Sequence, residues 1–125
     1  MNKTSPNAVE WFEIPTADIG QSIPFYNRVL GFALEAKEFG PNRIAIFPHV
    51  DPGPGGCIMQ GPGMVPSGTG SVVYLPTANI DLAIAQVEAA GGKIALPKTP
   101  IGGDIGFFAR FLDPEGNLVG LCGRV

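Results

Sequence analysis

The sequence predicts an α+β fold built from two copies of a βαβββ module. Three observations predict it. Residues 15–19 (PTADI) return as residues 76–80 (PTANI), a shift of 61 residues. Each copy follows a strand-like segment and starts a helix-like one, and three more strand-like segments follow each helix. We therefore predict one domain over residues 1–125, with module one at about 7–62, a linker at about 61–70 and module two at about 71–125.

The elements of module one follow from local residue preferences. Residues 9–15 (VEWFEIP) mix aromatic and β-branched side chains and end at a proline, which predicts a strand. Asp18 suits a helix N-cap, Gln21 completes a capping box, and Gly31 supplies a C-terminal stop. These signals predict a helix over 19–29. Strands are then expected at 32–38, 43–48 and 57–60.

Module two repeats this order. A strand is expected at 71–75, followed by a helix over 80–90 that Asn79 caps and the pair Gly91-Gly92 ends. The remaining strands are expected at 93–96, 107–112 and 118–122.

Composition narrows the classes of partner and the cellular location. Apolar residues make up 45% of the 125 residues and charged residues 15%, enough to bury a core. Lys and Arg number 8 against 11 Asp and Glu, without a basic run, so no nucleic-acid partner is expected. No apolar stretch predicts a membrane span, and the first residues do not form a signal peptide, so we expect a cytoplasmic protein without a membrane partner. Cys57 and Cys122 form no disulfide framework and are expected to be reduced.

Two segments carry a family resemblance. Residues 25–26 (FY) with 30–32 (LGF), and residues 111–118 (FLDPEGNL), together with the repeat, resemble the vicinal oxygen chelate superfamily. That superfamily includes lactoylglutathione lyases, extradiol dioxygenases, fosfomycin-resistance transferases and bleomycin-binding proteins, and its stand-alone glyoxalase-like branch is most similar. The resemblance implies a glyoxalase/bleomycin-resistance fold, with half-open antiparallel sheets around a concave pocket and helices outside. It also implies a homodimer that binds a small organic ligand.

The resemblance also implies where metal ligands would stand. The superfamily's ligand positions fall on Trp11, Val72, Gly120 and either Ile58 or Cys57. The chain has a single histidine, His49, whereas a divalent site needs three or four converging N, O or S ligands. We therefore expect the family metal site to be lost, with no cofactor in its place.

The face of the first strand that carries Trp11 is then the pocket face, and alternation adds Glu13 to it. Glu13 is a candidate catalytic base, with a structural ion pair or an interface carboxylate as the alternative. Arg110 is a candidate catalytic residue that clamps an anionic group; alternatively, it only pairs with Glu13. Both interpretations of Arg110 place these two side chains close together.

The expected ligand pocket is formed by Trp11, Glu13, Cys57, Tyr74, Phe108 and Arg110. Its aromatic residues suit flat or apolar ligands, although aromatic residues on strands also serve as plain core. Cys57 and His49 flank one hairpin, and a thiolate–imidazole pair between them is a further candidate for catalysis.

Three functions remain open at this point. The first is a metal-independent lyase or isomerase in which Glu13 is the base and Arg110 binds an anionic or aromatic ligand. The second is a non-catalytic drug- or metabolite-binding protein, as the resemblance to bleomycin-binding proteins implies. The third is a metal-dependent lyase or dioxygenase with displaced ligands, such as Glu13, His49 and a carboxylate of a partner chain.

Overall fold

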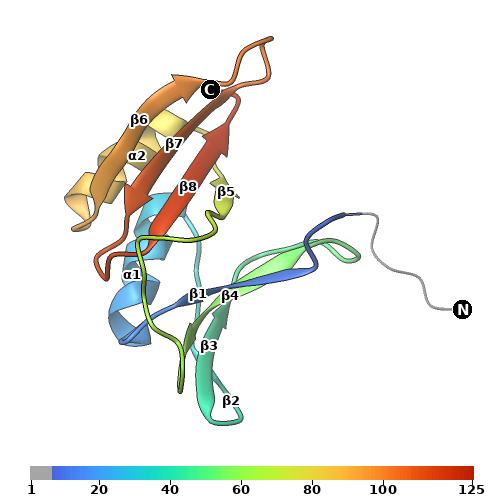
Figure 1. Cartoon of the computed structure of the whole chain (residues 1–125), viewed down its shortest axis with the longest axis vertical. Coiled ribbons are helices and arrows are strands. Elements are labelled where there is room, and N and C mark those ends of the chain that lie inside the picture. Colours follow the sequence, from blue (N-terminus) through green and yellow to red (C-terminus); the bar gives the residue numbers. More distant parts are fainter. Residues whose placement is uncertain (1–6) are drawn as a thin grey trace, which may run out of the picture.

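A computed structural model describes residues 7–125 as two βαβββ modules joined by a linker (Figure 1). Module one comprises β1 (Trp11–Pro15), α1 (Ile19–Leu30), β2 (Lys37–Phe39), β3 (Asn42–Ile46) and β4 (Gly55–Gln60). Module two comprises β5 (Tyr74–Pro76), α2 (Ile80–Ala89), β6 (Lys93–Pro100), β7 (Phe107–Leu112) and β8 (Leu118–Gly123). The predicted order of elements is confirmed.

Each module forms its own four-stranded sheet. The strand order is β1-β4-β3-β2 in sheet A and β5-β8-β7-β6 in sheet B. The first strand runs parallel to the last strand of its module, and the other neighbours are antiparallel. The sheets are therefore mixed, whereas the expectation was antiparallel sheets, because the helix after each first strand carries the chain back across the sheet.

Local capping explains where both helices begin. The Asp18 carboxylate accepts the backbone N–H of Gly20 at 3.0 Å, and the Asn79 side chain accepts that of Leu82 at 3.1 Å. Helix α1 ends at Gly31, whose φ of 71° is readily adopted only by glycine. Both predicted helices are confirmed to within one residue at either end.

The strand predicted at 32–38 is wrong over most of its length, because only Lys37–Phe39 forms a strand. The side chain of Asn27 accepts the backbone N–H of Leu34 at 2.7 Å and donates to its carbonyl at 3.4 Å. These bonds replace a sheet partner and let the buried Leu34 side chain reach the core. A side chain from the helix therefore holds this segment out of the sheet.

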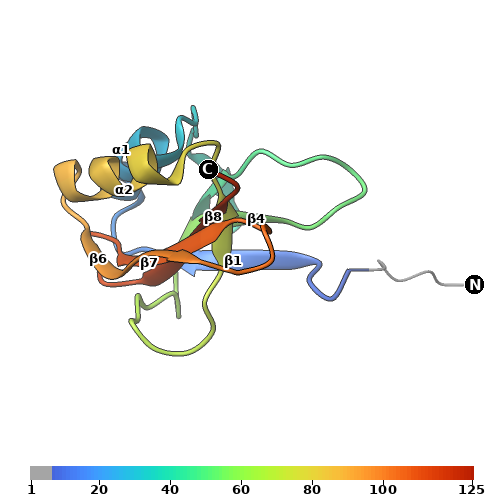
Figure 2. The ribbon, with the colours of Figure 1, turned by 90° about the horizontal axis from the view of Figure 1, so that it is seen from above.

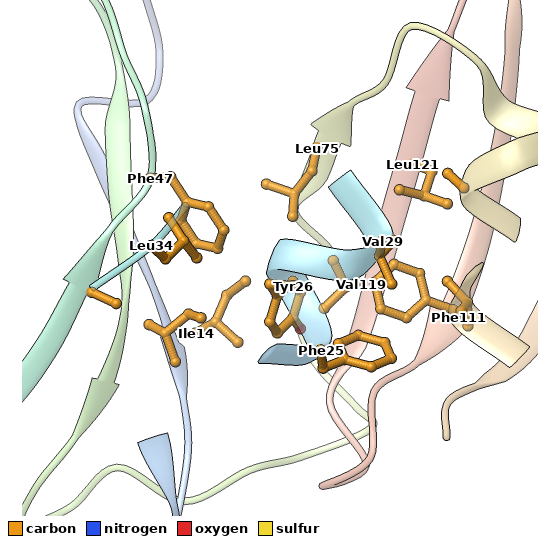
Figure 3. Close-up of a cluster of buried hydrophobic side chains, with 14 of the residues drawn as sticks. Ile14, Phe25, Tyr26, Val29, Leu34, Phe47, Leu75, Phe111, Val119 and Leu121 are labelled. Carbon is orange, nitrogen blue, oxygen red and sulfur yellow. The ribbon is translucent and has the colours of Figure 1, made fainter. Parts of the chain in front are cut away.

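The two modules share one hydrophobic core. Helices α1 and α2 lie together on one side of the strands (Figure 2). Phe25 and Tyr26 project from α1 between the buried side chains of the two sheets (Figure 3). The ring centroid of Tyr26 lies 5.9 Å from that of Phe47, which follows sheet A, and 6.3 Å from that of Phe111 in sheet B. Because α1 packs against both modules, their packing is coupled.

Polar contacts join the modules at the end of this core. The Glu115 carboxylate, in the turn before β8, accepts the backbone N–H of Ala17 at 2.6 Å and the hydroxyl of Thr16 at 2.7 Å. The Asn117 side chain donates to the carbonyl of Pro15 at 2.7 Å. The turn of module two therefore binds the chain between β1 and α1 of module one. Neither helix in residues 7–125 is long and apolar enough to cross a membrane.

Candidate ligand-binding site

Sheet A has one face that carries no helix. Along its strands, Ile14, Ala45 and Ile58 point into the shared core, so alternation directs their neighbours Glu13, Ile46 and Cys57 to the other face. Trp11 lies on this outer face and is 42% exposed. A cavity of about 340 Å³ lies here; it is lined by Trp11, Glu13, Lys37, Phe39, Ile44, Ile46, Cys57 and Met59. Three predicted pocket residues, Trp11, Glu13 and Cys57, are thus brought together.

Glu13 and Cys57 are register neighbours on β1 and β4. Burial, and secondarily the negative charge of Glu13, raise the pKa of the Cys57 thiol to about 11. A thiol with this pKa stays protonated near neutral pH and is a poor nucleophile. The imidazole of His49 lies near the carbonyl of Phe47 (3.3 Å) and the carboxylate of Asp51 (3.4 Å), so the suggested pair with Cys57 does not form.

Sheet B presents the other three predicted pocket residues on its own helix-free face. Nε of Arg110 donates to the hydroxyl of Tyr74 at 2.6 Å. The guanidinium carbon of Arg110 lies 5.9 Å from the Tyr74 ring centroid and 5.7 Å from that of Phe108, within cation–π range. The two rings meet edge to face, 6.0 Å apart. A cation is therefore held between two aromatic side chains.

Gly120 leaves the space in which Tyr74 and Arg110 meet. It stands between Tyr74 and Arg110 in the sheet register. A Cβ atom at this position would collide with the Tyr74 ring, so the missing side chain leaves room for the ring to lie over the strand. The same position is one of the implied metal-ligand positions, and here it accommodates an aromatic ring instead.

Equivalent positions of the repeat carry different residues on the two helix-free faces. Glu13 stands opposite Cys57 in sheet A, and Tyr74 stands opposite Gly120 at the matching place in sheet B. The face of sheet A carries the Glu13 carboxylate, and the face of sheet B carries the Arg110 guanidinium. No ion pair or hydrogen bond joins Glu13 to Arg110 within residues 7–125, because the two lie on different sheets and the guanidinium contacts Tyr74. Glu13 is exposed, without a hydrogen-bond partner in this part of the chain.

The donor set does not fit the metal site that the resemblance implies. Trp11 and Gly120 offer no ligand atom, and Val72 precedes β5. Residues 7–125 hold no group of three or more His, Cys, Asp or Glu side chains that would coordinate one ion. The implied ligand positions therefore do not supply the donors that a divalent metal needs.

Sequence reasoning missed two residues that line the sheet A cavity at its edge. Lys37 and Phe39 belong to β2, and Phe39 is 59% exposed. The sequence signal was that Lys37 and Phe39 are two residues apart and so lie on one face of a strand. The strand predicted at 32–38 ended before Phe39 and hid this signal. Lys37 adds a cation to the face that carries Glu13.

A comparison of the sequence with models of protein families identifies the family to which this chain belongs. The family model of the Glyoxalase/Bleomycin resistance protein/Dioxygenase superfamily matches residues 8–121. The chain therefore belongs to this superfamily, as the resemblance implied. The comparison with curated proteins finds no match.

Solved structures with the same fold include both an enzyme and a binding protein. A glyoxalase I variant from Zea mays is 23% identical, with a TM-score of 0.70; the match covers 98% of this chain and 49% of that one. The chain thus spans about half the length of the maize enzyme. An antibiotic binding protein from a Streptomyces species is also 23% identical, with a TM-score of 0.68 and coverage of 97% of this chain and 98% of that chain. A glyoxalase/bleomycin resistance protein from Albidiferax ferrireducens is 19% identical, with a TM-score of 0.69 and coverage of 95% and 100%. At these identities the matches establish the fold.

Proposed function

We propose that this protein binds a small aromatic organic compound that carries an anionic group, and that the helix-free faces of the two sheets form the walls of the site. The observation that carries the proposal is the cluster of Arg110, Tyr74 and Phe108. The hydrogen bond from Nε to the Tyr74 hydroxyl fixes the plane of the guanidinium. A cation oriented in advance between two rings is suited to a flat anion.

The guanidinium keeps donors for a ligand. Arginine has five N–H donors, and only Nε has a partner within residues 7–125. The terminal nitrogens are free to form paired bonds with a carboxylate, sulfonate or phosphate. Because Arg110 is half-buried, such bonds are less screened than those of a fully exposed arginine.

A homodimer is the second part of this proposal. Within one chain the two faces belong to separate sheets, and large apolar side chains remain exposed on both: Trp11 at 42% and Tyr74 at 37%. A second copy that places its Glu13 face near Arg110 would cover this surface and enclose the ligand. The length of the maize enzyme, about twice that of this chain, supports a pair of copies as the complete unit.

Binding without turnover agrees best with the side chains of the site. The Cys57 thiol has a pKa raised to about 11. Residues 7–125 hold no group of three metal donors, and in the same range Glu13 has no hydrogen bond that would orient it as a base. The structural neighbour from Streptomyces is itself an antibiotic binding protein. We therefore place this chain with the drug- or metabolite-binding members of its superfamily.

One observation favours a second candidate, a metal-independent lyase or isomerase. Among residues 7–125, Glu13 is the only acidic residue that lines the sheet A cavity. A ligand that displaced water from this cavity would raise the basicity of the carboxylate and let it accept a proton. Glu13→Gln separates the candidates: it abolishes turnover of the enzyme but changes only the affinity of a binding protein.

The test uses 8-anilinonaphthalene-1-sulfonate, a flat aromatic anion whose fluorescence rises on binding. We expect Arg110→Met to weaken its binding at least tenfold, because the substitution removes the cation but keeps most of the side-chain length. Arg43→Met is the matched control, since Arg43 pairs with the exposed Glu38 at the edge of sheet A. Equal affinities for the wild type and Arg110→Met would contradict the proposal. Native mass spectrometry of the untagged protein reports subunit number and co-purified ligand, and a strict monomer would reject the dimeric site.

A further inference from the structure

A second cavity, separate from the sheet A cavity, opens between the two modules. Its volume is about 480 Å³, within the range of roughly 300–1,000 Å³ that is usual for small-molecule pockets. It is lined by Val9, Phe12, Phe32, Phe47, Pro48, Pro54, Gly55, Gly56, Val72, Val73, Tyr74, Leu75 and Pro76. Phe47 and Leu75 mark its two sides, one on each module, and both face the space between the modules (Figure 3). Tyr74 is the only residue that it shares with the pocket predicted from the sequence.

The described side chains that line this cavity are almost all apolar. Among its lining residues within 7–125 there is no charged side chain, and the Tyr74 hydroxyl, their one polar side-chain group, is bonded to Arg110. Pro48, Pro54 and Pro76 lack a backbone N–H. The amide of Phe47 already donates to the carbonyl of Gly56 at 2.9 Å, and that of Gly55 to Glu10 at 3.3 Å. An ion would therefore lose hydration here without gaining a charged partner.

Three phenylalanine rings form a preformed wall. The Phe12 ring lies over Gly56, where an added Cβ would collide with it, and stacks on Phe47 with centroids 5.6 Å apart at 30°. Phe32 meets Phe47 edge to face at 6.0 Å. Phe12 and Phe32 remain half-buried although they pack against the shared core. An aromatic ligand would cover these rings and complete their packing.

We infer that the intermodule cavity is a second binding site, for a neutral, apolar, ring-containing organic molecule. The absence of charged side chains among the lining residues within 7–125 selects against anions and cations, and the phenylalanine wall favours a flat hydrocarbon framework. The site differs in ligand chemistry from the Arg110 site, and it holds or fails independently of the function proposed above. Two ligands of different charge are thus expected to bind one chain at the same time.

The experiment uses N-phenyl-1-naphthylamine, an uncharged relative of the anionic probe with the same ring system. Trp11 is the only tryptophan of the chain, and its ring lies within 3.1 Å of the place where a Cβ of Gly55 would stand, at the wall of the cavity. Energy transfer from Trp11 to the probe therefore reports binding near sheet A, and the variants below distinguish the intermodule cavity from the sheet A cavity that Trp11 itself lines. We expect saturable binding of one probe per chain that is insensitive to salt, because no charge is involved.

A matched pair of variants locates the site. Val72 lines the cavity but is not part of the shared core, so Val72→Phe is expected to fill the space and weaken binding of the neutral probe at least tenfold. Val65→Phe is the control, because Val65 is 73% exposed in the linker. Val9→Phe narrows the rim from a position that is 52% exposed, and it replaces Val72→Phe if that variant fails to fold. Arg110→Met should weaken binding of the neutral probe far less than Val72→Phe does, because the cavity and the Arg110 cluster share only Tyr74.

A lack of saturable binding of the neutral probe would overturn the inference, and so would equal affinity of the wild type and the cavity variants. Loss of neutral-probe binding in Arg110→Met would also overturn it, because the probe would then bind on the sheet B face. A fall in binding as the protein dimerises would show that a second copy covers the cavity. Failure of the anionic probe alone would count against the proposed function and leave this inference intact.

Discussion

The hydroxyl of Tyr26 donates a 2.7 Å hydrogen bond to Oδ2 of Asp113, a residue 87 positions further along the chain. Tyr26 belongs to the helix of module one and Asp113 to the turn before β8 of module two, and both are buried. The carboxylate of Asp113 also accepts the side-chain N–H of Asn117 at 3.0 Å. This buried link couples the packing of the modules, and it acts together with the contacts that Glu115 makes to the start of α1.

Tyr26→Phe should lower the free energy of unfolding by about 1.5–3 kcal/mol, the usual cost of losing a hydrogen bond to a charged group. The substitution keeps the ring and leaves the buried Asp113 carboxylate without its hydroxyl donor. Urea unfolding measures the change, with the slope expected to stay constant. Tyr74→Phe is the matched control, since the chain has no third tyrosine and Tyr74 is 37% exposed; its effect should stay within about 0.5 kcal/mol. Equal losses in the two variants would contradict the coupling.

The same link predicts the response of stability to alkaline pH. Burial, and then the charge of Asp113, raise the pKa of Tyr26 well above its usual value. Above about pH 10 the unfolded chain releases the phenolic proton and the folded chain keeps it, so stability falls as pH rises. The stability of the wild type should therefore decline more steeply above pH 10 than that of Tyr26→Phe. If the stability of the two proteins fell equally with pH, the raised pKa of Tyr26 would be contradicted.

Gly120→Ala should disturb the Arg110 cluster through sterics alone. The new methyl group would meet the Tyr74 ring, and displacing the ring should cost about 1–3 kcal/mol of stability. Binding of the anionic probe should weaken as well, because Tyr74 orients Arg110. The double variant Gly120→Ala with Tyr74→Ala removes the collision, so its stability loss should be less than the sum of the single losses. Strict additivity would show that the ring and the strand do not interfere.

The two cysteines should differ in reactivity. Cys57 is fully buried with a pKa raised to about 11, whereas Cys122 is half-buried. At pH 8 a disulfide reagent should modify one thiol rapidly in the native protein and both in urea. Cys122→Ala should remove the fast phase, and Cys57→Ala should retain it. A fast reaction in Cys122→Ala would show that Cys57 is accessible and would revive it as a nucleophile.

Much of the fold follows from short segments of sequence. The repeated PTADI and PTANI segments mark the same point in both modules, and Asp18, Asn79 and Gly31 set helix ends through contacts within a few residues. Such local signals also located β7 and β8 within one residue. They failed at 32–38, where the Asn27 side chain replaces a strand partner, because a side-chain hydrogen bond from a helix to the loop that follows it leaves no periodic trace in the sequence.

The candidate site depends more on tertiary packing than the helix ends and strands do. The resemblance selected Trp11 and Arg110. Alternation then added Glu13 to the face of Trp11 and Phe108 to the face of Arg110, since a strand places every second side chain on one face. Which of them meet depends on how the sheets pack. The structure pairs Arg110 with Tyr74 across Gly120 and separates it from Glu13.

The sequence by itself thus determined the repeat, the order of the elements and the superfamily, because turns, caps and strand patterns are properties of neighbouring residues. Only the tertiary structure decided the parallel pairing of the first and last strands, the link from Tyr26 to Asp113 and the apolar cavity between the modules. These features join residues far apart in the chain through packing and buried hydrogen bonds, and no local pattern encodes that geometry.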